Sequence, residues 1–150
     1  MTTVLTGKDT QIFGGRVLRD LPDGDVTTID FPNDLVTAKV GKNGNAIYAF
    51  NASGLICEVT QRVFRGSDDD KYFSSQIASY IQDPAAYVTM SGNFVKKIGH
   101  GDGTTTNDTY VFSGGIIKKF PTAKDNVEGD SEAAVTTYNI VFTNPSRALL

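Results

Sequence analysis

Fifteen glycines and five prolines divide this 150-residue chain into short segments. Short segments with alternating side chains, separated by glycine and proline clusters, are typical of β-strands joined by turns. The chain is therefore expected to be mostly strand. The expected strands are Gln11–Arg19, Val26–Phe31, Leu35–Val40, Ala46–Phe50, Leu55–Arg65, Ala86–Lys97, Asp108–Phe120 and Ala133–Thr143.

Two glycine-containing motifs predict local geometry. Lys42-Asn43-Gly44-Asn45 contains Asn-Gly, the strongest short hairpin signal, so the strands on either side of it should pair. Gly114-Gly115 interrupts a long strand, which indicates a bulge or a bend. A further turn is expected at Pro22-Asp23-Gly24-Asp25.

The expected strand Leu55–Arg65 has an unusual pattern. One face carries Leu55, Cys57, Val59, Gln61 and Val63, and the other carries Ile56, Glu58, Thr60, Arg62 and Phe64. Neither face is purely solvent-like, so both should be at least partly covered. This favours a subunit that completes its burial against neighbouring molecules.

One helix is predicted over Asp68–Gln82. Ser67 is a preferred N-cap, and three aspartates follow it in the first turn, where the helix dipole favours negative charge. Asp83-Pro84 ends the helix. Its apolar residues recur at helical spacing and are expected to form a stripe buried against a sheet. The stripe is Phe73, Ile77, Tyr80 and Ile81.

Together these elements indicate a mainly β (α+β) chain with a single domain over residues 1–150. The expected architecture is two packed antiparallel sheets, a sandwich or partial barrel, with one flanking helix at 68–82.

Composition excludes several classes of protein. Hydrophobic residues make up 39% of the chain and charged residues 21%, which fits neither a disordered nor a membrane-inserted chain. A net charge of −3 disfavours a strongly basic nucleic-acid-binding surface. The first residues lack the pattern of a signal peptide, and no stretch reaches the ~18 apolar residues of a membrane span. We expect synthesis in a reducing cytoplasm.

The residues that could carry chemistry are few. His100 is the only histidine, and a general base or ligand oriented by Asp102 is one interpretation; an exposed loop histidine among glycines is the preferred one. Cys57 is the only cysteine, and its mid-strand position favours a buried apolar role over nucleophilic catalysis.

The acidic clusters are explained without a metal. Asp68-Asp69-Asp70 lacks the alternating acids, the glycine and the late glutamate of a calcium loop, so helix capping is preferred. Asp102 and Asp108 flank a threonine run that is better explained as a polar loop. We therefore expect no enzyme, no catalytic residue, no metal and no cofactor.

Several phrases, in their order along residues 11–147, resemble the tail tube proteins of contractile-tailed bacteriophages. Each phrase is unspecific alone, and the order carries the resemblance. The phrases are Asp23-Gly24-Asp25-Val26, Pro32-Asn33-Asp34, Gly41-Lys42-Asn43-Gly44-Asn45, Arg65-Gly66-Ser67-Asp68-Asp69, Asp83-Pro84-Ala85, Gly92-Asn93-Phe94-Val95-Lys96-Lys97, Gly114-Gly115 and Glu128-Gly129-Asp130-Ser131-Glu132.

The resemblance implies a structural role in a virion. Subunits of that family form homohexameric rings that stack into the hollow inner tube of the tail, the conduit for genome delivery. It implies a tail sheath protein outside, a tape-measure protein in the lumen, and initiator, baseplate and terminator proteins at the ends. DNA would pass through without specific binding, and no membrane insertion is implied. Assembly would take place in the bacterial cytoplasm.

The hairpin region Lys39–Leu55 is the predicted ring-to-ring contact. It combines two turn signals with small polar tips and three large apolar residues. The candidate interface residues are Lys42, Asn43, Gly44, Asn45, Ile47, Tyr48 and Phe50. The alternative is a simple hairpin packed inside its own subunit.

Other functions stay open at this point. The chain could be a baseplate or tail-terminator component, a carbohydrate-binding β-domain with an exposed aromatic platform, or an enzyme centred on His100 and Asp102. The tube could also belong to a tailocin or a type VI-like secretion system rather than to a virion.

Overall fold

A computed structural model describes residues 1–150 except 8, 23, 124 and 126–133. The described chain is mainly β, with one α-helix and two short 3-10 turns. The elements are β1 (Val4–Leu5), β2 (Thr10–Phe13), β3 (Arg16–Val17), β4 (Thr27–Asp30), β5 (Val36–Val40), β6 (Ala46–Phe50), η1 (Ala52–Leu55), β7 (Cys57–Phe64), α1 (Asp68–Gln82), η2 (Pro84–Ala86), β8 (Met90–Gly99), β9 (Thr105–Ile117), β10 (Thr122–Ala123), β11 (Val135–Phe142) and β12 (Ser146–Leu149).

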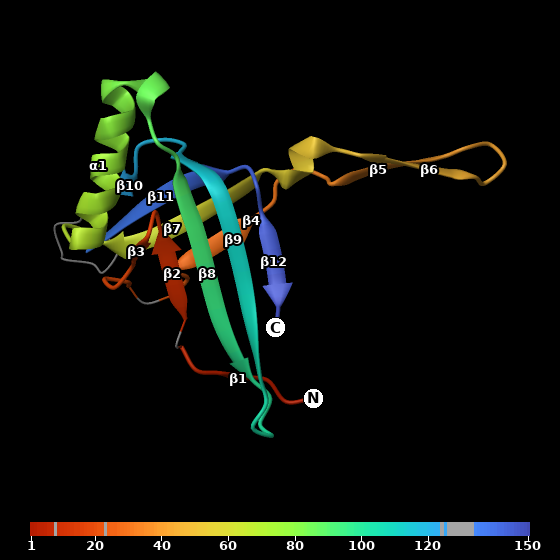
Figure 1. Cartoon of the computed structure of the whole chain (residues 1–150), viewed down its shortest axis with the longest axis horizontal. Coiled ribbons are helices and arrows are strands. Elements are labelled where there is room, and N and C mark those ends of the chain that lie inside the picture. The colour runs from red at the N-terminus through yellow and green to blue at the C-terminus, as the bar shows by residue number, and fades with distance from the viewer. Residues whose placement is uncertain (8, 23, 124, 126–133) are drawn as a thin grey trace.

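The strands form one large antiparallel sheet and one small sheet. The large sheet runs in the order β3-β2-β8-β9-β11-β7-β4, with β1 added to β8, β10 to β11 and β12 to β9. The small sheet contains only β5 and β6. Figure 1 shows β5 and β6 projecting from the rest of the molecule, which we call the body.

The expected pair of packed sheets is present as two halves of one continuous sheet. Strand β9 belongs to both halves, because its first part pairs with β8 and β12 while Ile116 and Ile117 pair with β11. The described strands do not close into a barrel.

The predicted irregularity at Gly114-Gly115 lies where β9 passes from one half to the other. Gly114 has a φ of 69°, a conformation that favours glycine. A Cβ on Gly115 would lie 2.4 Å from the Phe142 ring and 2.8 Å from the Met90 carbonyl oxygen. The glycine pair therefore allows the backbone of β9 to approach its neighbours closely as the strand changes partners.

An aromatic core joins the two halves. The Phe13 ring lies 5.1 Å from the rings of Phe73 and Phe94, edge-to-face in both cases. Phe112 stacks on Phe142 at 5.3 Å, across the fold in the sheet. Each such pair contributes about 0.5–1.5 kcal/mol of stability beyond the burial of its two rings. The buried cluster is Phe13, Leu18, Cys57, Val59, Val63, Phe73, Met90, Phe94, Phe112, Tyr138, Ile140 and Phe142.

Strand β7 has the two faces that its sequence predicted. Cys57, Val59, Gln61 and Val63 are fully buried, whereas the alternate residues Glu58, Thr60 and Arg62 are half-buried. Gln61 is tolerated in the core because Thr27 donates to its side-chain oxygen at 2.5 Å.

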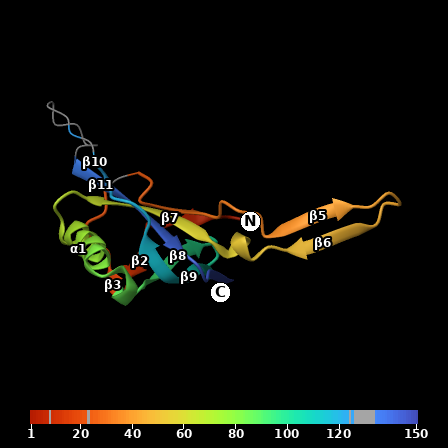
Figure 2. The same cartoon turned by 90° about the horizontal axis from the view of Figure 1, so that it is seen from above.

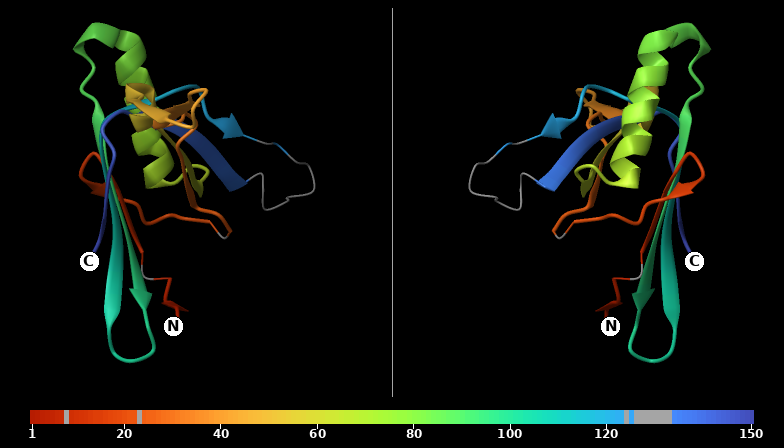
Figure 3. Two further views of the ribbon diagram at one scale, coloured as in Figure 1. Left: turned by 90° about the vertical axis from the view of Figure 1, so that its right-hand side faces the viewer. Right: turned by 90° about the vertical axis from the view of Figure 1, so that its left-hand side faces the viewer.

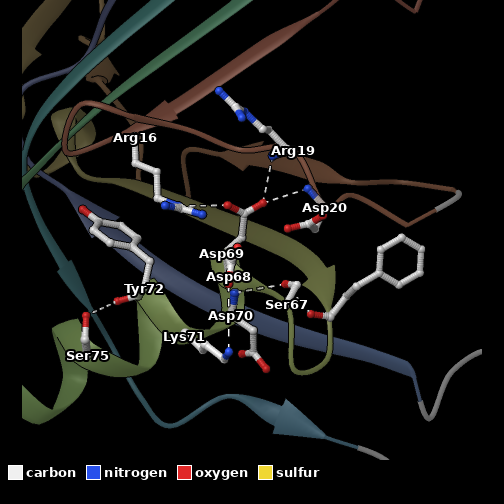
Figure 4. A network of polar contacts seen from close by, with 11 residues as sticks. Arg16, Arg19, Asp20, Ser67, Asp68, Asp69, Asp70, Lys71, Tyr72 and Ser75 are labelled. Carbon is white, nitrogen blue, oxygen red and sulfur yellow. Dashed lines mark hydrogen bonds and ion pairs between the residues drawn. The ribbon is translucent and has the colours of Figure 1, made fainter.

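The helix has the predicted bounds. Its N-cap Ser67 accepts a hydrogen bond from the Asp70 backbone N–H at 3.2 Å. Asp69 is fully buried and accepts from Arg16 Nε at 2.9 Å and from the backbone N–H groups of Arg19 and Asp20, both at 2.8 Å (Figure 4). Ser67 thus caps the helix, and Asp69 ties it to β3 and to the segment that follows β3.

The expectation of a buried helix stripe is wrong in its second half. Phe73 is fully buried and Ile77 packs against the core, but Tyr80 is exposed and Ile81 is 59% exposed. The reason is the placement of α1, which extends past the edge of the strands below it, as Figure 3 shows.

Some sequence features fall on residues outside the described part of the chain. These are Asp23 in the turn expected after the first strand, Ala133 at the start of the last expected strand, and the Glu128–Glu132 phrase.

Candidate assembly surface

The projecting hairpin, residues 36–50, is here called the arm. Every residue from 31 to 50 is exposed, and Figure 2 shows the arm extending well away from the body. Its turn is the predicted one: the Gly41 N–H donates to the Asn45 carbonyl at 2.7 Å, and Gly44 has a φ of 82°. A hairpin packed inside its own subunit, the alternative considered above, does not match this placement.

The strand register divides the arm into two unlike faces. Residues opposite each other in an antiparallel pair share a face. One face is entirely apolar, and the other carries Thr37, Lys39, Ile47 and Ala49. We call the first the apolar face of the arm; its cross-strand pairs are Val36 with Phe50, Ala38 with Tyr48 and Val40 with Ala46.

The exposed area on the apolar face is large for a lone hairpin. Val40 is 73% exposed, Tyr48 72% and Phe50 66%. Burying one such side chain fully, relative to leaving it in water, is favourable by about 1.5–3 kcal/mol. A two-stranded hairpin without further packing is only marginally stable in water. Contiguous exposed apolar surfaces are typical of interaction sites, so the apolar face of the arm is a candidate for one.

The two segments that flank the arm are held against each other where the arm meets the body. The Asn51 N–H donates to the Leu35 carbonyl at 2.8 Å, and the Asn33 side chain donates to the Ser53 carbonyl at 3.2 Å. Gly54 is buried, and a Cβ there would lie only 2.5 Å from the Leu35 Cα. These contacts hold together the two connections between the arm and the body.

The predicted interface residues all lie on the arm but do not share one face. Lys42, Asn43, Gly44 and Asn45 form its tip, and Tyr48 and Phe50 lie on the apolar face. Ile47 is on the opposite face. Sequence reasoning missed Val36 and Val40, although their alternation with Thr37 and Lys39 was a readable signal.

The residues considered for catalysis take part in local structure. His100 Nε2 lies 2.8 Å from Thr106 Oγ1. Asp102 accepts from the Thr104 hydroxyl at 2.5 Å and from its backbone N–H at 3.0 Å, and these hydrogen bonds lower the pKa of Asp102. Both residues belong to the turn between β8 and β9.

Cys57 lies in the core on β7. Burial, with smaller effects from Asp30 and Glu58, raises the pKa of its thiol to about 12. A thiol with this pKa holds its proton at neutral pH and is a poor nucleophile.

The described residues contain no group of three or more histidine, cysteine, aspartate or glutamate residues placed to hold a metal ion. In the same part of the chain, no helix combines the length and apolarity needed to cross a membrane.

Comparison with known proteins does not assign a family. No protein-family model matches the chain, and no curated protein matches it.

Proposed function

We propose that this chain is a structural subunit that assembles with copies of itself into hexameric rings, stacked as the hollow inner tube of a contractile phage tail. The observation that carries the proposal is the apolar face of the arm, which the body of the same subunit leaves uncovered. The order of sequence phrases supplies the family resemblance. Tail sheath, tape-measure and end-capping proteins are the partners that this function implies.

The open sheet supports self-assembly. Strands β4 and β12 lie at sheet edges, and every residue of β12 is exposed. Free edges pair readily with another strand unless something covers them. In a ring where the edge strands of neighbouring subunits pair with each other, these free edges are no longer present. Head-to-tail contacts of the arm would let such rings propagate into a filament.

The solvent-facing side of β8 and β9 suits a conduit for DNA. Lys97 is the one charged residue on that side of the two strands, whereas the ion pairs of Lys96 and Asp108 lie on the opposite side. A surface with few cations makes few phosphate contacts and holds DNA weakly. The alternating side chains concerned are Ser91, Asn93, Val95 and Lys97 on β8, and Thr105, Asn107, Thr109, Val111 and Ser113 on β9.

Negative-stain electron microscopy of the purified full chain tests the proposal. We expect six-membered rings or hollow tubes at high protein concentration. The proposal would be overturned if only monomers were seen at every concentration and if the sheath and initiator proteins from the same gene cluster did not change this.

A further inference from the structure

We propose that the tip of the arm of one copy docks through Lys42 into an acidic cleft beside β2 and β4 of a neighbouring copy. This inference rests on the proposed function, because it specifies which surface of the next subunit receives the arm. It assigns a role to a cleft that the fold alone leaves unexplained.

The cleft opens between the two halves of the folded sheet. It has a volume of about 340 Å³ and is lined by segments of β2, β4, β8 and β9. Its lining carries Asp9, Asp25, Asp108 and Lys96. Asp9 is paired with Lys96 and Asp108 with Arg147, so the acidic excess of the cleft lies at Asp25. Ile29, Phe94 and Tyr110 supply an apolar floor on which the methylene chain of a lysine could pack.

One acceptor in this cleft lacks a donor. Asp9 Oδ2 accepts from Lys96 Nζ at 2.9 Å. Its other oxygen, Oδ1, is buried and has no hydrogen-bond partner among the residues that the structure describes. A buried carboxylate oxygen without a donor is unfavourable, so a donor entering the cleft from outside would stabilise it. An ammonium group supplies both the donor and the opposite charge.

The arm carries the complementary charge. Residues 35–55 include Lys39 and Lys42 and no acidic residue, so this segment has a charge of +2. The whole chain has a net charge of −3, which leaves −5 on the rest. Lys42 is exposed at the tip, between Gly41 and Gly44, where neighbouring side chains are small. Attraction between a cationic tip and an acidic cleft also fixes the register of the two copies.

The direction of the arm makes this contact intermolecular. In Figures 1 and 2 the tip of the arm lies far from β2, β4, β8 and β9, the strands that line the cleft. The apolar groove beside α1, lined by Ile77, Ile81 and Phe120, is a poorer receptor for the tip. Lys118 and Lys119 also line that groove, and they would repel Lys42.

A charge swap tests the contact. The fraction of protein that pellets on ultracentrifugation measures assembly. We expect Lys42→Glu and Asp25→Lys each to reduce this fraction at least tenfold. The double variant restores opposite charges and should recover most of the pelleting fraction. Lys119→Glu is the matched control, because it makes the same charge change at an exposed lysine outside the arm, and it should pellet like the wild type.

A disulfide trap gives a second readout. A mixture of Lys42→Cys chains and Asp25→Cys chains should form a covalent dimer under mild oxidation, whereas Lys119→Cys mixed with Asp25→Cys should not. Three results would overturn this contact while leaving self-assembly intact. They are a Lys42→Glu variant that pellets like the wild type, a double variant that pellets no better than the single variants, and equal cross-linking in both mixtures. A wild-type chain that never assembles overturns the proposed function as well.

Discussion

Val36 and Phe50 lie opposite each other where the arm leaves the body, with both side chains on one face and both exposed. The pair begins a continuous apolar face that runs along both strands to Val40 and Ala46. The aromatic core of the body is enclosed, whereas single apolar side chains such as Ile81 and Phe120 are exposed elsewhere on the surface. On the arm, the exposed apolar side chains lie side by side on two paired strands and form one face.

The first prediction concerns the two faces of the arm. The double substitution Tyr48→Ser and Phe50→Ser should lower the pelleting fraction at least tenfold, because it removes most of the apolar contact area. The melting temperature of the monomer should stay nearly unchanged, since neither side chain packs on the body.

The matched control for this prediction is Ile47→Ser. Ile47 is as exposed as Phe50 but lies on the opposite face of the arm. A loss of assembly in Ile47→Ser as large as in the double variant would show that the apolar face is not the contact surface.

The second prediction concerns the helix. Phe73→Ala should lower the free energy of unfolding by about 3–5 kcal/mol, because it leaves a cavity beside Phe13 and Tyr138. Ile81→Ala, on the exposed part of the same helix, should change it by less than about 0.5 kcal/mol. Urea denaturation followed by circular dichroism measures both, and equal effects would contradict the placement of α1.

The third prediction concerns the bend in β9. Gly115→Ala should lower the free energy of unfolding by about 1–3 kcal/mol, because the added methyl group has no room beside Phe142 and Met90. Gly41→Ala is the comparison, since a Cβ there meets only the Asn45 carbonyl oxygen, at an ordinary 3.5 Å. Thermal unfolding should give a clearly lower melting temperature for Gly115→Ala than for Gly41→Ala. A wild-type melting temperature for Gly115→Ala would argue against the close approach of β9 to Phe142 and Met90.

The fourth prediction concerns acid stability. Arg147 donates two hydrogen bonds to Asp108, both at 2.9 Å, and these hold the pKa of Asp108 below its usual value. A carboxyl group whose pKa is lower in the folded chain than in the unfolded chain stabilises the folded state at pH values above its pKa in the unfolded chain. That stabilisation is lost as the pH falls through the folded pKa. Asp108→Asn should therefore melt below the wild type at neutral pH.

The difference between the two melting temperatures should shrink as the pH falls below about 4, where the carboxyl groups of both folded and unfolded chains become protonated. Thermal melts between pH 2.5 and 7 measure it. A difference that stays constant over this range would assign the effect of Asp108→Asn to packing instead of charge.

Local signals predicted the helix well and the small hairpin nearly as well. Ser67 and Asp83-Pro84 define the ends of α1 through capping and backbone restriction, which act within a few residues. The Asn43-Gly44 turn likewise depends only on neighbouring residues.

Features that depend on distant contacts were harder to predict. The segment 146–149 has no amphipathic pattern, yet it forms β12, because β9 offers it a free edge to pair with. Tyr80 and Ile81 have helical apolar spacing, but periodicity does not tell how far the sheet extends beneath the helix. An apolar strand in a core and one on an exposed arm have the same sequence pattern, so the exposure of Tyr48 and Phe50 required the three-dimensional structure.

Amide hydrogen exchange at residues 36–50, measured on dilute monomer and on assembled particles, tests most directly whether copies of the chain cover the arm. We expect rapid exchange along the arm in the monomer and strong slowing once large assemblies form. Exchange that stays equally fast in both states would contradict it.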